Sequence, residues 1–496
     1  MSRTIYYLTR KWIIAIGLMI ILSCQLPVLA QFPEPAWYKS YGWIYLDEGE
    51  SLQQTSDGGF LIAGYTYRSL TGGADVYLIK TDSHGNLEWE KFYGGASDDW
   101  ANCIRATHDG YYILAGGTGS FDVEGSDVYL LKVDENGELI WQRTFGGSLS
   151  EEALSVAPAD DGGYIVAGHT TSFGAGSEDI YVVKTDDMGN PQWSKTFGGI
   201  YDDKAYAVQQ TSDGGYIIGG GTNYFGIFPP DAILIKTSST GDSLWTALLG
   251  GQQSDAGSAV IETFDSCYVL VGWTMSRGAG QHDVYVAKVN INGQLIWDET
   301  FGGDQTDIGR SVYQTFDGGF IIAGYSKSFG ATDQDAYIIR LNFKGDSLWT
   351  DLAGGPDEDY AWDAIETADG GYAIAGWTRS FSRGSKDAFL IRYDGATTHS
   401  DSHAELNLPA KTRLNQNYPN PFNPSTTISY SLNKSCHVNL DVYDLLGRKV
   451  GTIIDSNQDA GNYRIVFDGS DLSSGVYIYR LQTDQAALSQ QMILAK

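Results

Sequence analysis

The feature that most constrains this chain is a unit of 52 residues that occurs seven times in succession without insertion or deletion. A tryptophan marks the period at Trp37, Trp89, Trp141, Trp193, Trp245, Trp297 and Trp349. An aspartate opens a turn in the same register at Asp57, Asp109, Asp161, Asp213, Asp265, Asp317 and Asp369. A glycine ends the next apolar run at Gly64, Gly116, Gly168, Gly220, Gly272, Gly324 and Gly376. The repeat therefore accounts for most of a chain too long for one core.

One unit predicts four β-strands, at Ser51–Thr55, Phe60–Thr66, Val76–Lys80 and Leu87–Phe92, separated by turns rich in Gly, Asp and Asn. The strands are almost continuously apolar, which is typical of sheets packed on both faces. Four-stranded sheets stacked around an axis form a β-propeller, for which seven blades lie within the usual range. The sequence therefore predicts an all-β, seven-bladed β-propeller.

The two ends of the repeat region complement each other. The region begins with a lone fourth strand, Trp37–Gly42, and its last unit stops after a third strand, Asp387–Arg392. We expect one blade to be built from both ends, which closes the ring without an open sheet edge. The glycine hairpin followed by a tryptophan, as in Gly85 and Trp89, resembles the blades of quinoprotein-like propellers, and this resemblance implies the fold alone.

The first 30 residues read as a secretory signal peptide, with basic residues near the start, an apolar run at Trp12–Leu22 and cleavage after Ala30. The apolar run is too short to favour a membrane-spanning helix, so we expect no transmembrane segment in the mature chain. An alternative is that residues 21–24 form a lipobox, in which case Cys24 would be acylated and would hold the protein at a membrane.

Cleavage after Ala30 leaves three cysteines, Cys103, Cys267 and Cys436. An odd number in distant segments predicts small buried side chains, not a disulfide framework. The formal net charge of −29 argues against nucleic acid or an anionic membrane surface as a partner.

Motifs near the C-terminus resemble the type A C-terminal sorting domain of type IX secretion cargo. They occur in family order at 417–428, 442–444, 472–477 and 492–496. The resemblance implies Sec export, recognition by an outer-membrane translocon and a location outside the cell or on its outer surface. It also argues against the lipobox, because a tethered chain would cross the outer membrane less readily.

Alternating strands such as Val438–Val442 and Val476–Arg480 predict a small Ig-like β-sandwich for this segment. The predicted domains are therefore a signal peptide (1–30), a propeller (31–394), a linker (395–407) and a sorting domain (408–496).

Two rings of acidic residues recur with the repeat. The first comprises Asp47, Asp99, Glu151, Asp203, Asp255, Asp307 and Asp359, and the second comprises Asp75, Asp127, Asp179, Asp231, Asp283, Asp335 and Asp387. Both rings are expected on one face, where they would suit Ca²⁺ or a cationic partner. The alternative is that each carboxylate accepts backbone N–H groups of its own turn, and recurrence in every unit favours this structural role.

The same reasoning predicts structural ion pairs with turn carboxylates for a basic ring at Lys80, Lys132, Lys184, Lys236, Lys288, Arg340 and Arg392.

Residues that vary between units are the better candidates for ligand contact. After the repeated glycine we select Tyr65, His169, Trp273, Tyr325 and Trp377, with Asp99, Asp203 and Asp359 as flanking carboxylates. Aromatic faces stack on sugar rings and carboxylates bind hydroxyls, although packing between blades also explains such residues.

The sequence contains no zinc-like histidine spacing, nucleophile elbow or phosphate loop, and the constant period leaves no room for a catalytic insertion. We therefore predict no catalytic or cofactor-binding residues and a non-catalytic surface or extracellular protein that binds a glycan, cation or protein. The alternative is a secreted polysaccharide hydrolase or lyase that uses paired carboxylates near the propeller channel.

The calcium hypothesis predicts that a chelator lowers the thermal unfolding midpoint of the purified protein, because bound metal stabilises the folded state. An unchanged midpoint with and without chelator would exclude a stabilising metal ring.

Overall fold

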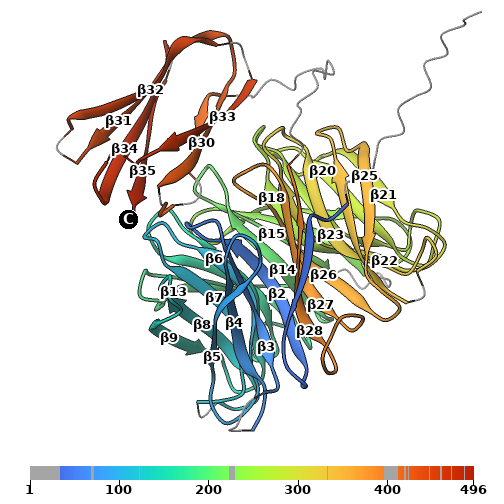
Figure 1. Cartoon of the computed structure of the whole chain (residues 1–496). Helices are drawn as coiled ribbons and strands as arrows, with labels where there is room; N and C mark the ends of the chain where they lie inside the picture. The colour runs from blue at the N-terminus through green and yellow to red at the C-terminus, as the bar shows by residue number, and fades with distance from the viewer. Residues whose placement is uncertain are drawn as a thin grey trace, which may run out of the picture. The chain divides into compact units, whose positions relative to one another are not determined.

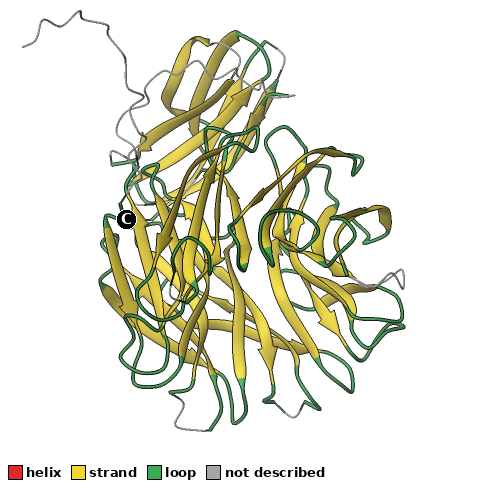
Figure 2. Ribbon diagram, turned by 90° about the vertical axis from the view of Figure 1, so that its right-hand side faces the viewer, coloured by secondary structure: helices red, strands yellow, loops and turns green. Residues whose placement is uncertain are grey.

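The computed structural model describes residues 34–495 except 69–71, 122, 223–229, 332, 396–410, 418–419, 423, 446, 459–460, 471 and 485. The predicted signal peptide, with Cys24 and Ala30, lies outside the described residues, as does the predicted linker after residue 395. In the described part of the chain the regular elements are all strands (Figure 2). No helix there is long and apolar enough to cross a membrane.

Within the described residues, the propeller consists of seven antiparallel four-stranded sheets. Figure 1 shows their arrangement. The first strands, which contact one another around the axis, are β2 (Asp47–Gln54), β6 (Asp99–Ala106), β10 (Glu151–Pro158), β14 (Asp203–Gln210), β18 (Asp255–Glu262), β22 (Asp307–Gln314) and β26 (Asp359–Glu366). The second strands are β3 (Phe60–Thr66), β7 (Tyr112–Thr118), β11 (Tyr164–Thr170), β15 (Tyr216–Thr222), β19 (Tyr268–Thr274), β23 (Phe320–Ser326) and β27 (Tyr372–Thr378).

The third strands are β4 (Asp75–Thr81), β8 (Asp127–Val133), β12 (Asp179–Thr185), β16 (Asp231–Thr237), β20 (Asp283–Val289), β24 (Asp335–Leu341) and β28 (Asp387–Tyr393). The outermost strands are β5 (Leu87–Tyr93), β9 (Leu139–Phe145), β13 (Pro191–Phe197), β17 (Ser243–Leu249), β21 (Leu295–Phe301), β25 (Ser347–Ala353) and β1 (Trp37–Tyr41).

The ring closes as the sequence predicts. Strand β1 pairs antiparallel with β28, so that Trp37 lies opposite Arg392 and the last sheet has the order β1-β28-β27-β26. One blade is thus built from both ends of the repeat region. This arrangement removes the exposed edge that an open stack of sheets would present.

The hydrophobic core of the propeller lies between adjacent blades. Leu61 and Leu78 of one blade, for example, share a buried cluster with Ile104 and Leu114 of the next. The middle strands are buried on both faces, which explains their continuous apolar sequences, whereas the outermost strands are partly exposed.

An ion pair between a buried cation and a partly exposed turn carboxylate joins the third strand of every blade to the turn between its first two strands. Lys236 Nζ lies 3.0 Å from an oxygen of Asp213, and the equivalent pairs occur in the other six blades at 2.5 to 2.9 Å. Burial opposes ionisation of Asp213, but hydrogen bonds from Thr211, the Gly215 N–H and Lys236 outweigh it and lower the pKa of the carboxyl. The predicted structural role of the basic ring is confirmed.

The C-terminal domain contains two sheets. One has the order β29-β30-β33, with β29 (Arg413–Leu414), β30 (Ser425–Leu432) and β33 (Gly461–Asp468). The other has the order β32-β31-β34-β35, with β31 (Cys436–Asp444), β32 (Lys449–Gln458), β34 (Gly475–Gln482) and β35 (Ala487–Leu494). Side chains of both sheets share one buried cluster, including Ile428, Val438 and Tyr479, as expected for a β-sandwich.

The ion-pair ring predicts that Asp213→Ala lowers the free energy of unfolding by about 3 kcal/mol, because the variant leaves the buried ammonium of Lys236 without its carboxylate. Chemical denaturation followed by tryptophan fluorescence measures this loss. Asp242→Ala is the matched control: Asp242 lies in the same blade as Asp213, and its exposed ion pair is with Lys195 of the preceding blade, so this variant should change stability much less. Equal losses in the two variants would contradict a special role for the pairing of the buried cation.

Candidate functional site

The first strand of every blade contains a β-bulge at its fourth residue. In β2 the pairing with β3 passes from Gly49 to Ser51, so Glu50 has no partner in the ladder. The equivalent residues in the other six blades are Asn102, Leu154, Tyr206, Ser258, Arg310 and Trp362. We call these seven side chains the bulge residues.

The repeated glycine of the second strand explains this bulge. A Cβ atom at Gly64 would lie 1.9 Å from the carbonyl oxygen of Glu48, and the same clash, at 1.8 to 1.9 Å, would occur at the other six glycines. No side chain fits between the two strands at this point. The glycine therefore permits the close approach that accompanies the bulge, and the bulge turns one residue out of the ladder.

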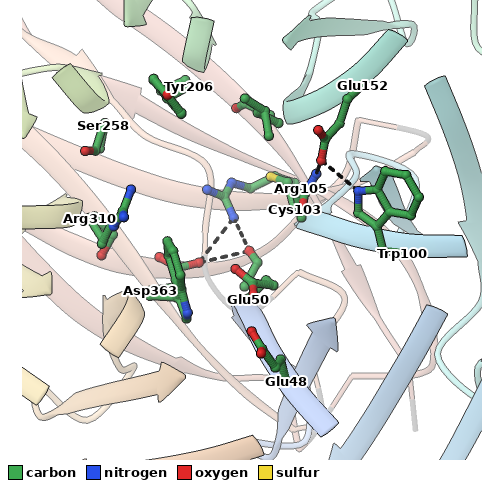
Figure 3. Close-up of a pocket in the computed structure, with 18 of the residues that line it drawn as sticks. Glu48, Glu50, Trp100, Cys103, Arg105, Glu152, Tyr206, Ser258, Arg310 and Asp363 are labelled. Atoms are coloured by element: carbon green, nitrogen blue, oxygen red, sulfur yellow. Dashed lines mark hydrogen bonds and ion pairs between the residues drawn. The ribbon is translucent and has the colours of Figure 1, made fainter. Parts of the chain in front are cut away.

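All seven bulge residues line one cavity in the central channel of the propeller. Its volume is about 630 Å³, which is within the range of small-molecule sites (Figure 3). The seven residues are all different, whereas the residue before each of them is Gly or Ala in every blade. Because the fold requires no particular residue here, the wall of the cavity is free to fit one asymmetric ligand.

Acidic and basic groups gather on one side of the cavity. Glu48 Oε1 lies 2.7 Å from Lys386 Nζ. Burial, together with the neighbouring Glu48 carboxylate, raises the pKa of Glu50 well above its usual range. Across from them Asp363 Oδ2 accepts a hydrogen bond from Ser51 Oγ at 2.9 Å and lies 3.5 Å from Arg105 Nη1.

Hydrogen bonds also fix the next part of the wall. Trp100 Nε1 and Asn102 Nδ2 donate to the same oxygen of Glu152, at 2.7 and 2.8 Å. The lining also includes apolar side chains, among them Leu154 and Val260. The cavity thus presents charged, hydrogen-bonding groups together with apolar ones.

Arg310 differs from the other charged groups of the cavity. Its guanidinium carbon lies 4.4 Å from the ring centroid of Trp362 and 5.6 Å from that of Tyr325. Arg310 Nε and Trp362 Nε1 are both buried, and neither has a hydrogen-bond partner among the described residues. Buried donors without partners are rare in folded proteins, which makes this pair a candidate for ligand contact.

Of the five variable residues selected from the sequence, Tyr65 lines the cavity. Tyr325 and Trp377 both stack on Tyr360, with centroids 4.1 and 4.3 Å away, so they contribute to packing between blades. Trp377 is only 4% exposed. Ligand contact by these two residues stays a prediction.

The other two selected residues also have protein partners. His169 Nε2 lies 3.7 Å from Glu178 and 3.9 Å from Glu152, and burial together with Lys204 lowers the pKa of its imidazole. Trp273 packs edge to face against His282, with centroids 4.9 Å apart. Ligand contact at these positions is likewise untested.

The two acidic rings lie together at the junctions between blades, as expected from the sequence. Each aspartate of the first ring is completely or almost completely buried, including Asp99, Asp203 and Asp359. The Gly95 N–H donates to Asp99 at 2.7 Å, and the corresponding N–H groups donate to Asp203 and Asp359 at 2.8 Å. These contacts support the structural role of the first ring. Within the described ranges, no group of three or more His, Cys, Asp or Glu side chains is arranged to hold a metal ion.

The sequence reasoning did not find the bulge residues. The available signal for the bulge is the glycine inside the second strand of each blade, because an isolated glycine in a strand indicates a bulge. The bulge position also differs in all seven units, although the position of Tyr67 varies as much, so this second signal is not specific to the bulge residues.

Neighbouring carboxylates of the two acidic rings, such as Asp335 and Asp359, predict a stability that depends on pH. Burial and the nearby Asp359 raise the pKa of Asp335 from 3.8 to about 6, so the folded protein binds more protons than the unfolded chain between these values and loses stability as the pH rises through them. Asp335→Asn should therefore raise the free energy of unfolding by about 1 kcal/mol at about pH 7.5 and have little effect at about pH 4.5, as measured by urea denaturation. Asp304→Asn, in an exposed loop, is the control, and a gain that did not depend on pH would contradict the prediction.

Comparison with known proteins places the C-terminal domain in a family. Residues 416–495 match the model of the secretion system C-terminal sorting domain. The regulatory protein FlaEY of Caulobacter vibrioides is 28% identical over 185 residues, which cover 31% of this chain and 19% of that protein. This chain therefore spans about a fifth of the length of that relative.

Two solved structures show the range of the structural matches. The WD40 domain of Neurospora crassa Pan2 is 10% identical, with a TM-score of 0.41, over 69% of this chain and 88% of that one. PorZ of Porphyromonas gingivalis, a surface component of the type IX secretion system, is 11% identical, with a TM-score of 0.30, over 89% of this chain and 69% of that one.

The match at 416–495 agrees with the motifs and with the two-sheet fold of this segment. A sorting domain of this kind implies export to the cell surface or the extracellular space. The protein is therefore cargo of the type IX secretion system that carries a seven-bladed β-propeller.

Proposed function

We propose that the protein is a non-catalytic binding protein of the cell surface or extracellular space, which holds a glycan in the central cavity of its propeller. The observation that carries the proposal is the set of seven bulge residues, all different, around one cavity of about 630 Å³. A purely structural channel has no need for such variety in a chain whose structural positions, such as the glycine of the second strand, repeat in every blade.

The chemistry of the wall supports a sugar as the ligand. Tyr65, Trp100, Tyr206 and Trp362 bring aromatic rings to the cavity. Amide and carboxyl groups such as those of Asn102 lie beside them and suit the hydroxyl groups of a sugar ring. Apolar walls with a few placed polar groups are typical of small-molecule sites.

We propose that the ligand contacts the central channel and not the loop face, where the sequence analysis expected the contact. Carboxylates of the first acidic ring, which the sequence placed on the loop face, are buried and hydrogen-bonded within their own blade junctions. The proposed export route is the Sec pathway through residues 1–30, followed by type IX secretion through the C-terminal domain.

A hydrolase or lyase is the second candidate, and one observation favours it. Glu50 has a raised pKa beside Glu48, which is ion-paired with Lys386. Two carboxyl groups in one cavity, one of them with a raised pKa, are the kind of pair that acid and base catalysis of glycoside cleavage uses.

Calorimetric titration of the purified protein with a panel of neutral and acidic oligosaccharides tests the proposal. We expect Tyr206→Ala to weaken binding by about fivefold, because stacking on an aromatic ring contributes roughly 1 kcal/mol. Tyr201→Ala is the matched control, since Tyr201 belongs to the same blade, is 47% exposed and does not line the cavity. Equal binding by the two variants would place the site elsewhere.

Release of reducing ends, measured in the same samples, separates the two candidates. Binding without release supports the binding protein. Release that disappears in Glu50→Gln while binding persists would establish the hydrolase or lyase instead.

A further inference from the structure

Two basic groups at the cavity have acidic partners, and Arg310 is the basic group of the lining without one among the described residues. Arg105 faces Asp363, and Lys386 faces Glu48. Arg310 takes part in no hydrogen bond or ion pair there, and its Nε atom is buried. A guanidinium group is always charged and only donates hydrogen bonds, so an empty partner position around it attracts an anion.

A second donor lies next to Arg310. The guanidinium packs over the ring of Trp362, and the buried indole Nε1 also lacks a partner. An indole nitrogen donates and does not accept hydrogen bonds. Two adjacent side chains of the wall therefore offer donors alone.

The nearest candidate for an internal counter-ion is Glu50, whose carboxyl is influenced by the charge of Arg310. Burial and the adjacent Glu48 raise the pKa of Glu50 well above its usual range. Glu50 forms no hydrogen bond or ion pair with Arg310 among the described residues.

We infer that the cavity binds its ligand through a carboxylate, with Arg310 as its ionic partner and Trp362 Nε1 as a second donor. This inference rests on the proposed function and names the ligand class, a glycan ending in one uronate residue. Aromatic groups such as Tyr206 then contact the sugar ring. The net charge of −29 opposes the approach of a long polyanion, which favours a single acidic residue over a polyuronate.

The test compares two probes that differ only at the carboxylate, methyl β-glucuronide and methyl β-glucoside, by calorimetry on the full mature chain. We expect the wild type to bind the glucuronide at least about tenfold more tightly, because hydrogen bonds to charged groups are the stronger ones. Arg310→Met should abolish this preference for the glucuronide.

Two further variants keep the test independent of one substitution. Trp362→Phe retains the ring beneath Arg310 and removes the N–H group, so the glucuronide alone should bind several-fold more weakly. Arg277→Met is the control, because Arg277 is 46% exposed at its side chain, pairs with Asp298 and does not line the cavity. It should keep the wild-type preference. Thermal unfolding of each variant verifies that it is folded.

The outcomes separate the inference from the proposed function. Equal binding of the two probes by the wild type, or a preference that persists in Arg310→Met, overturns the inference while the binding function stands. Binding of neither probe, when a neutral oligosaccharide of the panel does bind, overturns the inference in the same way. Binding of no sugar at all overturns both.

Discussion

A single steric constraint shapes every blade of this propeller. The glycine of the second strand lies so close to the first strand that a Cβ atom would collide with a backbone carbonyl oxygen. The close approach accompanies a bulge, and the bulge directs one side chain per blade into the channel. The constraint that makes the seven blades alike therefore also creates the position at which they are free to differ.

The polar groups of the propeller divide into those that hold the fold and those that face the cavity. Each third-strand cation is buried and meets a turn carboxylate, as burial of a charge requires. Arg310 follows the opposite pattern, since it enters the cavity without an acidic partner in the described part of the chain. The contrast between complete pairing in the structural ring and an unpaired cation in the channel is the strongest chemical indication of a ligand.

The C-terminal sandwich has a hydrophobic core of its own, to which Ile428, Val438, Leu440 and Tyr479 contribute. Its two sheets enclose that core with residues of the domain itself. The family match to this segment implies export to the cell surface or the extracellular space, whereas the cavity belongs to the propeller. These two features thus lie in separately cored parts of the chain.

The sequence by itself determined the features that depend on periodicity and local chemistry. The 52-residue period predicted seven blades and their closure, and the recurring turn aspartate and strand cation predicted the pairs exemplified by Asp213 and Lys236. These predictions hold because each blade repeats the same short-range contacts. The sorting motifs were likewise sufficient to predict the C-terminal domain, because they lie in the family order within one segment of the chain.

Only the tertiary structure decided which residues meet in the cavity. Alternation along a strand does not identify the bulge residues, because one extra residue shifts every later side chain to the other face. The tertiary structure also places Tyr325 and Trp377 against Tyr360, although these two residues occupy the same position within the repeat as Tyr65. The wall joins residues from all seven blades, including Ser51 and Asp363, which are 312 positions apart and share a hydrogen bond. Whether the charge of Arg310 has an acidic partner depends on which distant residues meet in the cavity. No local sequence pattern predicts this.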